Sequence, residues 1–196
     1  MTKLIFRYNS FYDYMLARLA GEEFLSSHET EGKNYLSNIE GFWEPLNDKV
    51  FSHYQELGFV LPEYWFAYPV HHWKNLTPFD DPLTFIIKEN LEEVVATIIH
   101  EVCHNFFGYY ENREICDKIW KNVETRFTEE DSDTKKHLII IPLAASSLYK
   151  IFGQEKTEHL LNNEKKYEGL ERAWQIIDQN KPDFKNPLKL IFDLRL

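Results

Sequence analysis

The sequence has few cysteines, no long apolar run and no signal-peptide layout in its first residues, and each of these features argues against a class of protein. Its two cysteines, Cys103 and Cys116, are too few for the disulfide framework of a small secreted domain. The apolar stretches fall short of the roughly 18 residues that a membrane-spanning helix needs. The N-terminus lacks the layout of a secretion signal. We therefore expect a cytoplasmic protein with no membrane partner.

Basic residues are outnumbered along the 196-residue chain. It has 22 Lys and Arg against 32 Asp and Glu, which gives a net charge of −10, and no cluster of Lys or Arg reverses this locally. Such a surface repels nucleic-acid phosphates, so we expect no nucleic-acid partner. Hydrophobic residues make up 43% of the chain and aromatic residues 16%, which indicates an ordered globular core.

The spacing of apolar residues predicts a mainly helical α+β fold. Helices are expected over residues 8–20, 33–57, 90–107, 111–127, 137–152, 154–163 and 166–179. Pro45 predicts a break in the second helix, or the start of a new helix, near this residue. Residues 64–70 and 83–88 favour strands and predict a small sheet in the N-terminal half. We expect a single compact domain, 1–196, of two lobes: about 1–108 with the sheet, and 109–196, which is helical.

The segment His100-Glu101-Val102-Cys103-His104 carries the clearest chemical signal. It lies on the helix expected after Asn90, which resembles a capping box with Glu93. Two histidines four residues apart lie about 40° apart around a helix, so both imidazoles can reach one zinc ion. Glu101 can stand beside that ion and act as general base on a zinc-bound water. The alternative is an ordinary helix whose histidines only make hydrogen bonds.

At this motif the chain resembles the zincin metallopeptidases, which are marked by His-Glu-x-x-His. Zincins place the motif helix behind a strand that lines the substrate cleft, and residues 83–88 stand in the matching position. The resemblance covers roughly residues 60–120. It implies a zincin-like fold with an active-site helix and Zn²⁺ as the cofactor.

The third zinc ligand depends on the class of zincin. Metzincins would require a histidine at position 110 and a glycine at 107, where this chain has Tyr110 and Phe107. That class is excluded. In gluzincins the third ligand is a glutamate on the next helix, followed about one turn later by an aspartate. Glu114 and Asp117 match this order.

A tight reversal between the two helices would bring Glu114 to the level of His104 and Asp117 to that of His100. Asp117 could then orient His100 through its second ring N–H. The chain departs from the gluzincin pattern in its short gap, nine residues between His104 and Glu114, and in having Glu-x-x-Asp instead of Glu-x-x-x-Asp. Glu111 therefore remains the alternative third ligand.

Hydrolysis of an amide also needs a donor that stabilises the developing oxyanion. His137 is our first choice, because it begins the apolar helix of the C-terminal half. Tyr109 and Tyr110 are alternatives. Together these residues predict a zinc metallopeptidase that acts on a peptide or small protein. Two other hypotheses stay open: a binding module that keeps the zincin fold without activity, and a zinc hydrolase of a non-peptide amide.

Overall fold

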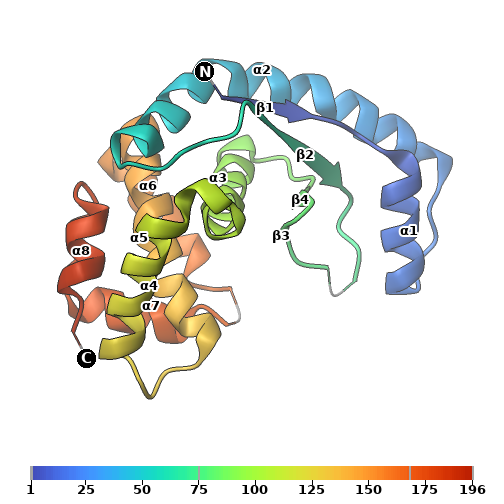
Figure 1. Cartoon of the computed structure of the whole chain (residues 1–196). Helices are drawn as coiled ribbons and strands as arrows, with labels where there is room; N and C mark the ends of the chain where they lie inside the picture. The colour runs from blue at the N-terminus through green and yellow to red at the C-terminus, as the bar shows by residue number, and fades with distance from the viewer. Residues whose placement is uncertain (1, 75, 168, 196) are drawn as a thin grey trace. The chain divides into compact units, whose positions relative to one another are not determined.

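The computed structural model describes residues 2–74, 76–167 and 169–195 (Figure 1). The described chain is mainly helical, with a small mixed sheet confined to its N-terminal half, which confirms the predicted fold at this level. It divides into two compact units. The first runs to Phe51 and resumes over Leu61–Val102, and the second comprises Ser52–Val60 and the chain from Cys103 onward.

The sheet of the first unit has the strand order β1-β2-β4-β3. Strands β1 (Lys3–Phe6), β2 (Tyr64–Val70) and β4 (Leu83–Ile86) are parallel, and β3 (Phe79–Asp80) runs antiparallel to β4. Strand β2 has its predicted bounds, and β4 ends two residues before its prediction. Strand β1 was not predicted, because a single short apolar patch at the N-terminus gave no periodicity to count.

Helix α2 (Ser26–Glu56) runs along β1 and β2 and is longer than predicted, since it starts earlier and does not break at Pro45 (Figure 1). The predicted break is wrong for a local reason. Pro45 and Gly41, four residues before it, are both exposed, so the carbonyl that loses its helical partner can bond to water. The neighbouring Trp43 packs edge-on against Phe6 at 6.1 Å, which holds this turn against the sheet.

A buried carboxylate joins helix α1 (Ser10–Ala20) to the end of β2. The side chain of Asp13 is fully buried and accepts four hydrogen bonds. The donors are the Tyr8 hydroxyl at 3.0 Å, the His71 backbone N–H at 3.1 Å, the His71 ring N–H at 2.7 Å and the Trp73 indole N–H at 2.6 Å. Burial opposes ionisation, but the hydrogen bonds from His71 and Trp73 prevail and hold the pKa of Asp13 below its ordinary value.

Replacing Asp13 with asparagine is therefore expected to destabilise the protein by about 2–3 kcal/mol at pH 7, because the amide cannot accept from all four donors. A lowered pKa in the folded state means that the stabilisation is complete above the pKa of the unfolded chain, roughly 3.9, and is lost as the pH falls through the folded value. Urea unfolding at pH 7 and at pH 3 measures both effects. The exposed Asp48→Asn is the control, and an equal loss in both variants at pH 7 would contradict this role.

The second unit is built around helix α5 (Ser132–Phe152), whose side chains are buried from Leu138 to Leu148. Helix α5 contacts α4 (Arg113–Arg126), α6 (Gln154–Glu164), α7 (Glu171–Gln179) and α8 (Pro187–Asp193). It begins five residues before its predicted start, because the Asp131 carboxylate caps it by accepting from the Thr134 N–H at 2.7 Å. Helix α7 is shorter than predicted, and α8 was not predicted. None of the helices in the described ranges could span a membrane.

Candidate metal centre

Helix α3 (Leu91–Gly108) carries the sequence motif, and its start was predicted correctly. The Asn90 side chain accepts from the Glu92 N–H at 3.1 Å and donates to the Glu93 carboxylate at 3.2 Å, as a capping residue does. One face of the helix is buried through a run of apolar residues: Val94, Val95, Ile98, Ile99, Val102, Cys103 and Phe106. The opposite face is half-exposed at Glu101 and His104, and His100 lies between the two at 9% exposure.

Three histidines bring ligand atoms together on α3 and α5. One ring nitrogen each from His100, His104 and His137 lies within 4.8 Å of the other two. The rings of His104 and His137 meet edge-on, with 5.3 Å between their centroids. Nitrogens that share one tetrahedral zinc lie about 3.4 Å apart, so the three side chains need only small adjustments to bind a metal ion. This cluster of described residues can hold a metal.

The geometry of His137 also fixes which of its nitrogens is available. Its Nδ1 lies 2.9 Å from the backbone carbonyl of Asp133, one turn earlier on α5. A carbonyl can only accept, so Nδ1 carries the proton and donates it. The lone pair of the neutral ring is then on Nε2, the atom left for a metal. Hydrogen bonds of this kind orient histidine ligands in known metal sites.

Cys103 lies between the two α3 ligands in sequence but does not join the cluster. It is fully buried, and its sulfur lies 3.1 Å from the hydroxyl of Tyr54, which belongs to the same unit. This geometry favours a core role over a metal role for Cys103. The Tyr54 hydroxyl stays protonated, because complete burial raises its pKa well above the ordinary value.

Glu114 and Asp117 are not members of the cluster. Both lie exposed on α4, and Asp117 faces Arg113 at 3.5 Å. The reason is the face that α4 buries, which carries Cys116, Ile119 and Val123. The carboxylates fall on the other side of the helix. Glu111, the alternative, is exposed too, within the short 3-10 helix η1 (Tyr110–Asn112).

Asn112 shows why the reversal before α4 differs from the expected one. Its side chain accepts from the Val60 N–H at 2.7 Å and donates to the Val60 carbonyl at 3.0 Å. These two hydrogen bonds hold η1 against Val60, in the segment after α2, and so determine where α4 begins. A turn held by a partner 52 residues away in the sequence cannot be predicted from local spacing.

His137 was predicted to face the ion as an oxyanion donor, and the structure places it beside His100 and His104 with a ring nitrogen as close as theirs. Its position at the start of an apolar helix was the signal that singled it out. The sequence did not reveal that a ring nitrogen of His137 lies within 4.8 Å of those of His100 and His104, close enough to act as a third ligand.

Comparison with protein-family models, with curated proteins and with solved structures finds no match to this chain.

Proposed function

We propose that this protein is a zinc-dependent hydrolase that cleaves peptide bonds, with His100, His104 and His137 holding the metal. The single observation that carries the proposal is the convergence of three ring nitrogens within 4.8 Å of one another. A glutamate, Glu101, follows the first of these histidines on the same helix. Three neutral imidazoles leave a fourth position open on a tetrahedral zinc, which is the arrangement of catalytic rather than structural zinc sites. The third ligand in this proposal is His137 instead of Glu114.

Glu101 is the proposed general base. It follows His100 directly and so lies about 100° further round α3, on the half-exposed face that water and substrate can reach. A bound zinc would supply Lewis acidity, which lowers the pKa of water and polarises a carbonyl. Glu101 would take the proton from the attacking water and return it to the leaving amine.

The resemblance to zincins supports a peptide substrate. The motif matches theirs, and β4 directly precedes the motif helix, as in that family. A histidine as third ligand departs from the gluzincin pattern expected from the sequence. The proposal is therefore a zincin-like hydrolase with its third ligand drawn from α5.

Removing the metal is expected to abolish hydrolysis. Dialysis against a zinc chelator should lower the cleavage of a fluorogenic peptide mixture to background, and one equivalent of Zn²⁺ should restore it. Metal content is measured by mass spectrometry in the same samples. Cleavage that persists in protein shown to be zinc-free would overturn the proposal. One bound zinc without any cleavage would favour the binding module instead.

A further inference from the structure

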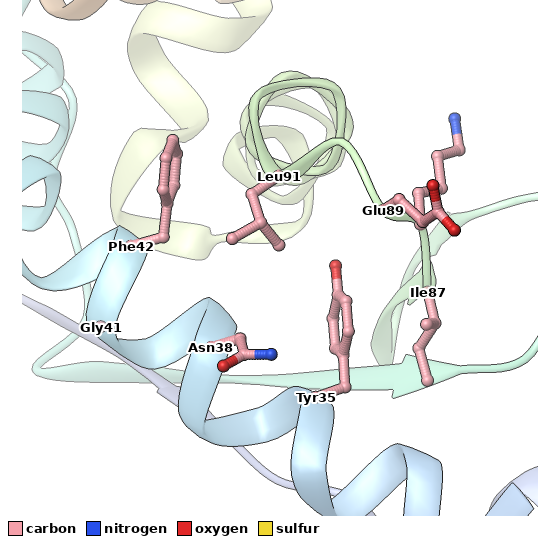
Figure 2. Close-up of a pocket in the computed structure, with 8 residues that line it drawn as sticks. Tyr35, Asn38, Gly41, Phe42, Ile87, Glu89 and Leu91 are labelled. Atoms are coloured by element: carbon pink, nitrogen blue, oxygen red, sulfur yellow. The ribbon is translucent and has the colours of Figure 1, made fainter.

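A cavity lies in the first unit, away from the three histidines. It has a volume of about 650 Å³ and is lined by α2 and by the segment that joins β4 to α3 (Figure 2). Leu91, on its wall, precedes His100 by nine residues, which is two and a half turns of α3. Leu91 and His100 thus point to opposite sides of the helix, about 14 Å apart along its axis. The cavity is separate from the metal centre.

Apolar side chains form most of its wall. Leu91 lies between Phe42 and the ring of Tyr35, and Ile87 lies on the other side of that ring (Figure 2). The charged residues at the rim are one cation, Lys88, and one anion, Glu89. Lys88 is also 3.8 Å from the Glu93 carboxylate, so its charge is partly neutralised. Lys88 and Glu89 carry opposite charges, so the rim has no net charge, and the apolar wall favours a neutral ligand.

Two uncharged polar side chains line the cavity, Asn38 and Tyr35, and Tyr35 is the buried hydrogen-bond donor. Its side chain is only 9% exposed, and its hydroxyl makes no hydrogen bond of standard geometry. Figure 2 shows this hydroxyl pointing from α2 into the space between Leu91 and Glu89. Burial raises the pKa of Tyr35 to about 12, against the opposing effect of the Lys88 backbone N–H, so the group is a protonated donor at neutral pH. A buried donor without an acceptor is costly, and a ligand that brings an acceptor removes that cost.

We propose that this cavity binds a neutral small molecule with an apolar body and one carbonyl-type acceptor, which receives a hydrogen bond from the Tyr35 hydroxyl. The volume suits such a ligand, since small-molecule sites span roughly 300–1,000 Å³. The proposal does not depend on the metal or on hydrolysis.

Prodan, a neutral naphthalene dye with a single ketone, is a suitable probe, because its emission reports both an apolar environment and a hydrogen bond to the ketone. The intact protein should bind it saturably. Tyr35→Phe removes only the hydroxyl and should weaken binding about 2- to 10-fold and shift the bound emission to shorter wavelength. Tyr110→Phe, at an exposed tyrosine, is the matched control and should leave binding unchanged.

Gly41→Leu tests the location independently. Gly41 lines the cavity, and a Cβ atom added there meets no atom within 4 Å, so the backbone accepts a side chain at this position and leucine is expected to occupy part of the cavity. Leucine also favours the helix more than glycine does, so the variant should fold. It should abolish saturable prodan binding. Equal binding by the original protein, Tyr35→Phe and Gly41→Leu would overturn the proposal, and so would no binding at all. Loss in Gly41→Leu alone would overturn the role of the Tyr35 hydroxyl.

Discussion

Replacing Glu101 with glutamine is expected to lower kcat/KM for peptide cleavage by about 10²- to 10⁴-fold while zinc stays bound. Glutamine has nearly the same shape, but it cannot accept a proton from the attacking water. It leaves the three histidines untouched, so the metal content should remain at one per chain. The paired measurement of zinc content and of initial rates separates loss of the base from loss of the site. In free-energy terms the loss is on the order of 3–5 kcal/mol of transition-state stabilisation.

Glu92→Gln is the matched control, because it makes the same change in the first turn of the same helix. It should leave the rate of cleavage within a few-fold of the original protein. If Glu101→Gln and the original protein cleave peptides at the same rate, Glu101 is not the general base. If Glu101→Gln also loses its zinc, the residue serves the site in another way, and the kinetic comparison no longer isolates proton transfer.

Replacing His137 with alanine is expected to weaken zinc binding by about 10²- to 10³-fold. Structural zinc sites with four protein ligands bind with about 10–16 kcal/mol at pH 7, so one ligand contributes on the order of 3–4 kcal/mol. Competition against a chromogenic chelator measures the affinity, and circular dichroism shows whether α5 is retained. Added imidazole should restore part of the affinity by occupying the space that the side chain leaves.

Glu114→Gln makes this test decisive between the two third-ligand assignments. Glu114 is exposed on α4, so its replacement should leave zinc affinity and hydrolysis unchanged. The opposite pattern, with affinity lost in Glu114→Gln and kept in His137→Ala, would restore the ligand that the gluzincin resemblance implied. Such a result would also mean that α4 turns its exposed face toward the metal when zinc binds.

The fold was predictable where local signals were strong. The start of α3 follows from Asn90 and its side-chain hydrogen bonds, and β2 follows from its run of aromatic residues. The predicted break at Pro45 was wrong, because burial of Trp43 in the same turn outweighs the lost helical hydrogen bond. The short strands β1 and β3 form by pairing with β2 and β4, respectively. Pairing between distant segments cannot be predicted from the few residues of each short strand.

Of the three clustered histidines, only His100 and His104 could be predicted as metal ligands from the sequence. His100 and His104 are neighbours on any helix, so spacing alone brings them together. His137 is 33 positions further along the chain, and the packing of α5 decides where it lies. Sequence order favoured the nearer Glu114, but the apolar stripe of α4 turns that residue outward. A local sequence motif therefore predicts the two ligands on one helix, but it cannot predict a third ligand that tertiary packing brings from another helix.

His137 donates its hydrogen bond to the main-chain carbonyl of Asp133 at 2.9 Å, and the carboxylate of the same residue lies further away, at 3.6 Å from the same Nδ1. Replacing Asp133 would remove the nearby charge but would leave the carbonyl that accepts from the ring, as long as α5 keeps its helical path there. The proton on Nδ1 is specified by the helix itself, whereas most orienting carboxylates are specified by one replaceable residue. The main-chain part of this orientation is kept whatever residue stands at position 133, and it is lost where the first turns of α5 are distorted.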